Sequence, residues 1–214
     1  MYWNTVNELL RESLSVLMQA EEFAAFRLVG GTSLSLQLGH RISVDIDLFT
    51  NADYGSVDFD SIDAFLVSHF AYVDADFGTP AGMGRSYLIG QDRENNVKLD
   101  LYYTTEKFIQ QPLTVDGIRL ATIEEIIAMK VDVVSRGGRK KDFWDLHELL
   151  PKYSISKMME LHQKRSEHTH NREQLLKNFR DFKQAEDDFD PECLRGKYWE
   201  FIKEDIELAL SAKD

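Results

Sequence analysis

The sequence predicts an α/β (α+β) protein in which a mixed sheet flanked by helices precedes a C-terminal helical region. Two observations lead to this class. Within residues 1–120, segments with the two-residue period of strands alternate with segments that have helical spacing. From Thr122 onward only helical spacing remains. We therefore expect an α/β region over residues 1–120 and a helical region over residues 121–214.

The first elements follow from apolar spacing and from glycines. Residues 3–20 have helical spacing, and the apolar run over residues 26–29 predicts a short strand. Gly30 and Gly31 then indicate a tight turn into a helix over residues 32–38.

Strict alternation over residues 43–49 predicts the next strand. Its apolar residues, Val44 among them, would face the core. Ser43, Asp45 and Asp47 would share the opposite face, because successive side chains of a strand point to opposite sides.

A helix, a strand and two hairpins complete the α/β region. We expect the helix over residues 59–70, the strand over 71–77, one hairpin from 86–89 and 97–103, and a second from 113–115 and 118–120. The Asp116-Gly117 turn joins the second hairpin. In the arm over residues 97–103, Lys98 and Asp100 face away from the core, and this arm could pair beside the strand that carries Asp45.

The helical region begins with a predicted capping box, in which Thr122 and Glu125 precede an apolar run. Gly137 and Gly138 end or interrupt that helix. Further helices are expected from Lys140 to just before Pro151, over residues 154–168, over 172–188 and over 197–211.

Composition limits the class of protein. Hydrophobic residues make up 43% of the 214 residues, and no apolar run is long enough to span a bilayer. A single cysteine, Cys193, can form neither an internal disulfide nor a multi-cysteine metal site. The start of the chain lacks a signal-peptide pattern, so we expect a cytoplasmic protein without a membrane partner. The net charge of −12 argues against a general nucleic-acid coat but not against a local basic patch.

The chemistry is expected at Asp45 and Asp47. Two carboxylates on one strand face repel each other unless a cation lies between them, and Mg²⁺ is the natural partner because it prefers oxygen ligands. Asp100 would be a third carboxylate from a neighbouring strand. The alternative is that these residues belong to the solvated face of a sheet.

The Gly30-Gly31 segment adds a second feature. The backbone N–H groups at the start of the helix after it can bind a phosphate, although the glycines alone would be compatible with a simple turn. The combination of glycine turn, helix and Asp-x-Asp strand is more specific than any one part.

At these residues the sequence resembles the AbiEii/AbiGii-type nucleotidyltransferases, the toxins of type IV toxin–antitoxin and abortive-infection systems. The first motif of that family runs from a Gly-Gly-Thr start, at Gly30, to an Arg-x-Ser-x-Asp-x-Asp end, at Asp47. Lys98-Leu99-Asp100 resembles its second motif. Lys130, followed by an Asp-x-x-Asp on a helix at Asp142 and Asp145, resembles its third.

The resemblance implies a nucleotidyltransferase-like mixed sheet of the DNA polymerase β type, and Mg²⁺-dependent transfer of a nucleotide from an NTP to an acceptor hydroxyl. The acceptor would be tRNA, and a cognate antitoxin is an expected partner. The implied catalytic cluster comprises Ser43, Asp45, Asp47, Asp100, Lys130 and Asp142, of which Asp45, Asp47 and Asp100 would be metal ligands. The implied nucleotide-binding residues are Gly30, Gly31, Thr32, Ser33, Arg41, Lys130 and Asp145.

Individual roles follow from the same resemblance. Ser43 would contact phosphate, and Lys130 would neutralise triphosphate charge. Asp142 would orient Lys130 or the nucleotide, supported by Asp145, whereas Asp100 is either a base or a metal ligand. Arg41 either binds phosphate or pairs with a carboxylate.

Several other features have less specific interpretations. The basic stretch over residues 136–141 either contacts NTP or RNA or stabilises helix ends. His162, His168 and His170 are expected at a solvated helix end, and His147 on a helix surface. The alternatives for function are a small-molecule or protein acceptor on the same fold, and a non-catalytic protein that senses nucleotide or holds a partner.

Overall fold

The alternating residues of strand β2 (Asp45–Thr50) determine how the sheet is covered. Ile46 and Leu48 are fully buried on one face, in a core shared with α1 (Glu8–Gln19) and α3 (Phe59–His69). Asp45 and Asp47 lie on the opposite face and remain partly exposed. The polar face of the sheet is thus left free for a functional site.

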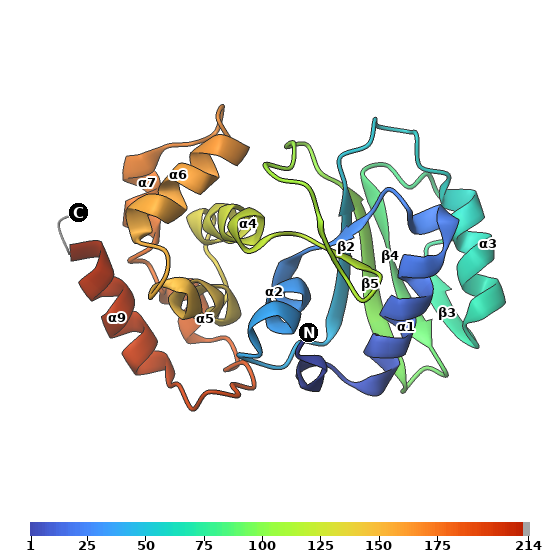
Figure 1. The fold of residues 1–214 in the computed structure, drawn as a ribbon, viewed down its shortest axis with the longest axis horizontal. Helices are drawn as coiled ribbons and strands as arrows, with labels where there is room; N and C mark the ends of the chain where they lie inside the picture. Colours follow the sequence, from blue (N-terminus) through green and yellow to red (C-terminus); the bar gives the residue numbers. More distant parts are fainter. Residues whose placement is uncertain (212–214) are drawn as a thin grey trace.

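β2 is the middle strand of a seven-stranded mixed sheet in the computed structural model, which describes residues 1–211 (Figure 1). The strand order is β3-β4-β5-β2-β1-β7-β6, which confirms the predicted α/β class. The other strands are β1 (Arg27–Leu28), β3 (Tyr72–Ala75), β4 (Gly84–Gly90), β5 (Asn96–Tyr103), β6 (Leu113–Val115) and β7 (Ile118–Leu120).

Three predicted pairings in the sheet are confirmed. β5 pairs with β2 in parallel, with Asp100 directly opposite Asp47 and Lys98 opposite Asp45. β4 and β5 form the predicted hairpin, and β6 and β7 are joined at Asp116 and Gly117, both with positive φ. The register brings two of the predicted carboxylates to neighbouring positions on the polar face.

Helices alone form the other half of the molecule (Figure 1). They are α4 (Ile123–Ser135), α5 (Lys140–Leu149), α6 (Ile155–Arg165), α7 (Arg172–Asn178), α8 (Lys183–Glu186) and α9 (Trp199–Ser211). Their core includes Phe143 and Trp144, as expected for a helix face that packs inward. None of the helices in the described part of the chain is long and apolar enough to cross a membrane.

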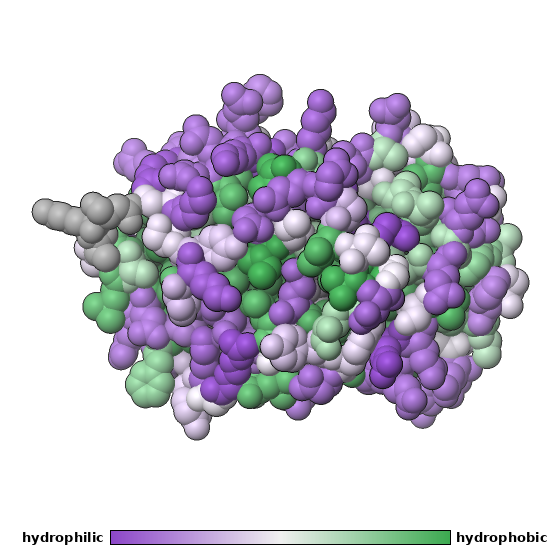
Figure 2. Space-filling view, viewed as in Figure 1, coloured by the Kyte–Doolittle hydropathy of each residue, from purple (hydrophilic) through white to green (hydrophobic). Residues whose placement is uncertain are grey.

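Helix α2 (Gly30–Leu38) joins the two halves. Leu36 packs into the core beneath the sheet, whereas Leu34 belongs to the core of the helical half. Figure 2 shows that hydrophilic side chains cover most of one face of the molecule, with apolar side chains grouped near its middle, where the halves meet.

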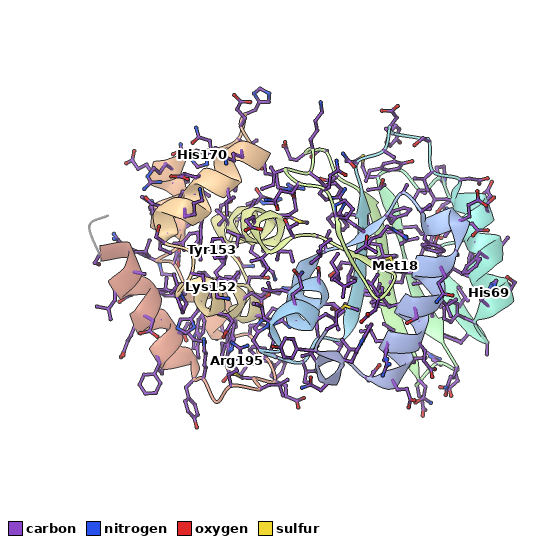
Figure 3. The ribbon with its side chains drawn as sticks, in the orientation of Figure 1. Met18, His69, Lys152, Tyr153, His170 and Arg195 are labelled. Atoms are coloured by element: carbon purple, nitrogen blue, oxygen red, sulfur yellow. The ribbon has the colours of Figure 1, made fainter. Side chains whose placement is uncertain are left out.

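A short backbone clip connects the loop before β2 to a distant segment. Ile42 N donates to Glu192 O and Leu194 N donates to His40 O, both at 2.9 Å, and Arg41 forms an isolated β-bridge with Cys193. In the side-chain view, Arg195 marks this connection below α5 (Figure 3). Residues beyond the expected catalytic motifs therefore hold the loop in place.

Three expectations about helices were wrong in their bounds. The first helix begins at Glu8 because the Asn7 side chain accepts from Leu10 N, and a 3-10 turn over Trp3–Thr5 precedes it. α2 begins at Gly30 instead of residue 32, so the glycines form the first turn of the helix.

The third wrong bound concerns residues 172–188, which form two helices instead of one. The chain bends between them because Phe179 and Phe182 both turn into the core, and the Asp181 carboxylate accepts from Lys183 N at the start of the second helix.

Two local expectations were also wrong. Val44 is 60% exposed because the strand begins only at Asp45, after Ser43 N has bonded to Thr5 O. The capping box at α4 is half formed: Thr122 accepts from Glu125 N, but the Glu125 carboxylate pairs with Arg165 instead of the cap.

Candidate active site

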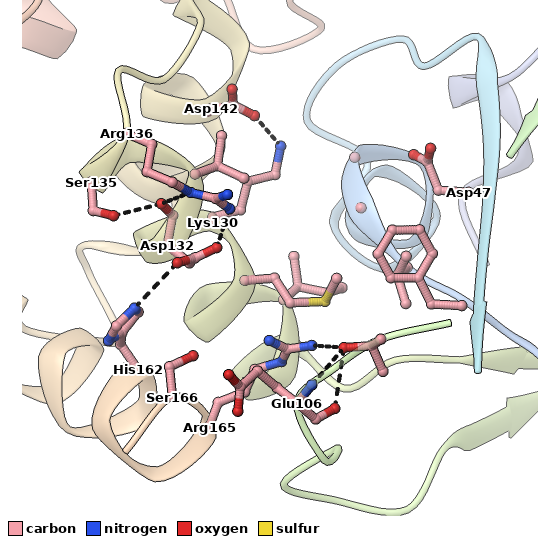
Figure 4. Close-up of a pocket in the computed structure, with 18 of the residues that line it drawn as sticks. Asp47, Glu106, Lys130, Asp132, Ser135, Arg136, Asp142, His162, Arg165 and Ser166 are labelled. Atoms are coloured by element: carbon pink, nitrogen blue, oxygen red, sulfur yellow. Dashed lines mark hydrogen bonds and ion pairs between the residues drawn. The ribbon is translucent and has the colours of Figure 1, made fainter. Parts of the chain in front are cut away.

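A cleft of about 760 Å³ opens between the sheet and the helical half. Five residues expected at the site line it: Gly30, Gly31, Asp47, Lys130 and Asp142. Figure 4 shows Asp47 on the sheet side and the Lys130–Asp142 pair facing it from the helices. The cleft therefore joins the groups that the sequence motifs placed far apart in the chain.

Asp47 is held against the first residue of α2. Val29 N donates to Asp47 O at 2.9 Å, and a Cβ on Gly30 would lie 2.7 Å from Asp47 Oδ2. Gly30 also has a φ of +66°, which side-chain-bearing residues rarely adopt. Glycine is required here for both reasons, and it lets the Asp47 carboxylate approach the N-terminus of the helix.

The carboxylates on this face repel one another. Burial, together with Asp100 and Asp45, raises the pKa of Asp47 to about 6. Among the described residues, the Asp47 carboxylate has neither an ion pair nor a side-chain hydrogen bond, whereas Lys141 Nζ lies 3.8 Å from Asp45 Oδ2. Lys130 and Lys141 act in the opposite direction on this pKa but do not outweigh burial and the neighbouring carboxylates, so the charge of Asp47 is only partly compensated.

Asp45 and Asp47 fit a hard divalent cation by chemistry, because both offer carboxylate oxygens from one strand face. Asp100 is differently placed: it accepts from Ser86 Oγ at 2.6 Å and pairs with Lys98. Within residues 1–211, no three His, Cys, Asp or Glu side chains are grouped closely enough to hold an ion. Each oxygen of Asp100 thus already has one partner and keeps a further lone pair with which it could become the predicted third ligand.

Lys130 lies at the centre of a buried ionic network. Its Nζ is 2.6 Å from Asp142 Oδ1 and 2.8 Å from Asp145 Oδ2. Burial alone would lower the pKa of Lys130, but Asp145 and Asp142 outweigh it and raise that pKa. Two of the three ammonium N–H donors are engaged, so one is available to a phosphate in the cleft.

Three cationic or polar side chains contact the carboxylate of Asp145. His40 Nε2 lies 2.8 Å from it, Arg41 donates through Nε at 2.7 Å and Nη2 at 2.9 Å, and Lys130 completes the set. Burial would raise the pKa of Asp145, but Lys130 and Arg41 hold it well below its usual range. Asp145 is fully buried and does not line the cleft. It therefore holds the Lys130 ammonium in position from the interior of the protein.

Arg41 is the residue for which the sequence left two roles open. Its guanidinium is buried against Asp145 and over the backbone of Gly31, where an added Cβ would collide with Nη2. Arg41 does not line the cleft. The structure therefore shows carboxylate pairing, and not exposure to phosphate.

Three predicted site residues have their side chains in the interior. Ser43 Oγ shares a 2.8 Å hydrogen bond with Thr32 Oγ1, which in turn donates to Asp45 O. Ser33 Oγ packs near Ala121 O. None of the three lines the cleft, because α2 presents only Gly30 and Gly31 to it. Ser43 and Thr32 connect α2 to the start of β2, and their side chains do not reach the cleft.

The cationic side chains of residues 136–141 lie in two different environments. Arg136, Arg139 and Lys141 line the cleft, whereas Lys140 is buried and pairs with Asp190. Burial lowers the pKa of Lys141, with Arg139 acting in the same direction. Lys141, 3.8 Å from Asp45, is a site residue that the sequence placed only within a general basic patch.

The helical side of the cleft contains residues that sequence reasoning missed. Arg165 donates to Glu125 at 2.7 Å and to Thr104 Oγ1 at 2.8 Å, and it lines the cleft with His162. The expectation of a solvated helix end was wrong for His162, which is 1% exposed because α6 packs on α4. His147 is also buried, and Asp205 lies 2.8 Å from its ring.

Comparisons with known proteins identify the family and the fold. The family model described as "Nucleotidyl transferase AbiEii toxin, Type IV TA system" matches residues 13–213. An uncharacterized protein of Aquifex aeolicus is 26% identical over 151 residues, which cover 67% of this chain and 66% of that protein, just under two thirds of its length.

Solved structures share the fold at low sequence identity. JHP933 from Helicobacter pylori superposes with a TM-score of 0.57 at 18% identity, covering 93% of this chain and 88% of that chain. MenT4, a nucleotidyltransferase toxin from Mycobacterium tuberculosis, superposes with a TM-score of 0.53 at 14% identity, covering 94% and 85%.

Proposed function

The chain belongs to the AbiEii family of nucleotidyltransferase toxins, and from this premise we propose that it uses Mg²⁺ to transfer a nucleotide from an NTP to the 3′ end of a tRNA. One observation carries the proposal. Asp47, which has no ion pair among the described residues, faces the N-terminus of α2 and the Lys130 ammonium across one cleft.

Mg²⁺ held by Asp45 and Asp47 would neutralise phosphate charge and lower the pKa of a coordinated hydroxyl. The transfer itself requires the acceptor oxygen to bond to the α-phosphorus while the bond to the β-phosphate oxygen breaks and pyrophosphate leaves. Such a reaction depends on in-line positioning and charge stabilisation more than on covalent participation by the protein.

The chain's own residues provide that positioning. Gly30 and Gly31, in the first turn of α2, line the cleft, and their backbone N–H groups would bind a phosphate there. Lys130 offers its remaining N–H, fixed in direction by Asp142 and Asp145. Asp100, opposite Asp47 on the neighbouring strand, would receive the proton of the acceptor hydroxyl or join the metal ligands.

The exposed cations at the cleft support an anionic acceptor. Arg136 and Arg139 have side chains that are 70% and 61% exposed, and both line the cleft in a chain whose net charge is −12. A tRNA end would be drawn to this local patch in spite of the overall charge. The family description also supports a cognate antitoxin as a partner.

The test is label transfer from each of the four NTPs to total tRNA in the presence of Mg²⁺. We expect transfer by the natural chain, a loss of about 100-fold or more in Asp45→Ala, and no change in Asp187→Asn. Asp187 is an exposed carboxylate outside the cleft. Absence of transfer from every NTP, with a folded protein, would contradict the proposal, and transfer only to a small molecule or protein would contradict its acceptor.

A further inference from the structure

Helix α9 leaves apolar side chains in contact with solvent. Its inner face is buried, since Trp199, Ile202 and Ile206 pack into the core of the helical half. Its outer face carries Phe201 and Leu208, which are 60% and 68% exposed. Among the helices of the described part of the chain, only α9 exposes two large apolar side chains. Figure 1 shows α9 at the outer edge of the molecule, and none of its residues lines the cleft.

These side chains belong to a stripe with the spacing of a coiled-coil seam. Tyr198, directly before the helix, is 66% exposed, and its ring centre lies 6.2 Å from that of Phe201 in an edge-to-face arrangement. Tyr198, Phe201, Asp205 and Leu208 follow one another at intervals of three, four and three residues. This is the a/d pattern by which one helix packs along another. The stripe therefore fits a second helix.

Asp205 places a carboxylate in the middle of the stripe. Its side chain is 55% exposed, and its Oδ2 lies 2.8 Å from His147 Nε2. A helix that docked on the stripe would cover this carboxylate, and covering a charge is costly unless a cation pairs with it. A partner helix with Lys or Arg opposite Asp205 would provide that cation.

Acidic side chains also border the stripe. Glu200, Glu204 and Glu207 are exposed, and the helical repeat of 3.6 residues places all three on the same side of the stripe. The helix has a single cation, Lys203, which lies on the other side of these residues and pairs with Glu200 at 2.9 Å. This surface therefore attracts a basic partner and repels RNA or an anionic lipid surface.

A second copy of this chain would not complement the stripe. If two α9 helices paired in parallel with their stripes aligned, Asp205 would face Asp205. If they paired antiparallel, Asp205 would face Phe201 of the other copy. Neither arrangement brings a cation to the carboxylate, because the outer face of α9 has none. The charge pattern thus favours a different protein.

We propose that the outer face of α9 is a docking surface for a helix of another protein. That helix has apolar residues at heptad spacing, Lys or Arg opposite Asp205, and further basic residues beside the glutamates. The apolar seam provides most of the affinity, and the complementary charges fix the register and exclude other partners. The surface is separate from the cleft, so the proposal does not depend on nucleotide transfer.

The test uses two synthetic heptad peptides as probes. Both have leucine at the a and d positions except for one central a position. The basic probe has Lys at that position and at e and g, and the acidic probe has Glu at the same places, so that neither pairs with itself. Fluorescence anisotropy measures their binding to the natural chain. We expect saturable binding of the basic probe and binding of the acidic probe that is about tenfold weaker or more.

Three variants locate the binding. Phe201→Ser should weaken binding of the basic probe about tenfold or more, because it removes a large apolar contact from the seam. Val67→Ser is the matched control, since Val67 on α3 is 59% exposed, and it should leave binding unchanged. Asp205→Lys should reverse the preference, so that the acidic probe binds more tightly than the basic one. Circular dichroism checks that the variants are folded.

Several results would overturn the proposal. These are absence of saturable binding, equal binding of the two probes, or binding of the basic probe that neither Phe201→Ser nor Asp205→Lys alters. A dimer of the natural chain in sedimentation, dissociated by Phe201→Ser, would also overturn it, because a second copy would then occupy the stripe. The label-transfer assay is independent of all these outcomes.

Discussion

The Asp47 carboxylate is expected to serve metal binding, but its charge destabilises the metal-free fold. Its pKa of about 6 means that the folded protein without metal holds an ionised carboxylate unfavourably at neutral pH. A cation in the cleft would reverse this effect, so the binding of Mg²⁺ would be linked to stability.

We predict that Asp47→Asn abolishes transfer but stabilises the metal-free protein by about 1–2 kcal/mol at pH 7.5. An acid whose pKa is higher in the folded state destabilises the fold above its ordinary pKa, so the gain grows as the pH rises from about 4 to 6. Urea unfolding in EDTA at several pH values measures it. A variant less stable than the natural chain at pH 7.5 would contradict the interpretation.

At the scale of elements, α2 can pack against the loop before β2 only because residue 31 is a glycine. Gly31 has ordinary backbone angles, but an added Cβ would collide with the Arg41 guanidinium. The glycine therefore serves packing, whereas Gly30 serves both conformation and the approach of Asp47.

We predict that Gly31→Ala lowers the free energy of unfolding by about 2–4 kcal/mol, because Arg41 must leave Asp145. The matched control is the same change in an Arg41→Met background, where the collision is gone and the further loss should fall below about 1 kcal/mol. Equal losses in both backgrounds, measured by urea unfolding, would show that Arg41 is not the reason.

The elements also show how much of the site the sequence could predict. Alternation and glycines predicted β2, the β4–β5 hairpin and the neighbouring positions of Asp47 and Asp100, because these features depend on local periodicity. The α6 side could not be predicted. Arg165 reaches Glu125 over 40 residues of sequence, and a polar helix face looks the same whether it meets solvent or a cleft.

Over the whole molecule, Asp145 connects the two halves. It joins α5 to Lys130 of α4 and to His40 and Arg41 of the loop before β2. Asp47 belongs to the sheet and Lys130 to the helical half. Their relative placement across the cleft therefore depends on these contacts.

We predict that Asp145→Asn destabilises the protein by about 3–5 kcal/mol, since it leaves buried cations without their carboxylate. The depressed pKa of Asp145 gives stability that is present above about pH 4 and is lost as the pH falls further. The variant should therefore show a shallower loss of stability between pH 4 and 2, as followed by urea unfolding.

Asp205→Asn is the matched control, because Asp205 accepts from His147 at a site that is 55% exposed. Its effect should be below about 1 kcal/mol. Equal effects of the two substitutions would show that Asp145 does not hold the halves together.

The clip between residues 40–42 and 192–194 has a consequence for synthesis on the ribosome. At about 5–20 residues per second, roughly 7–30 s separate translation of the Asp45–Asp47 segment from translation of the residues that secure the loop before it. During that interval the nascent sheet carries its carboxylates without the clip. A nucleotidyltransferase toxin would thus complete its cleft late, after most of the chain has left the ribosome that makes it.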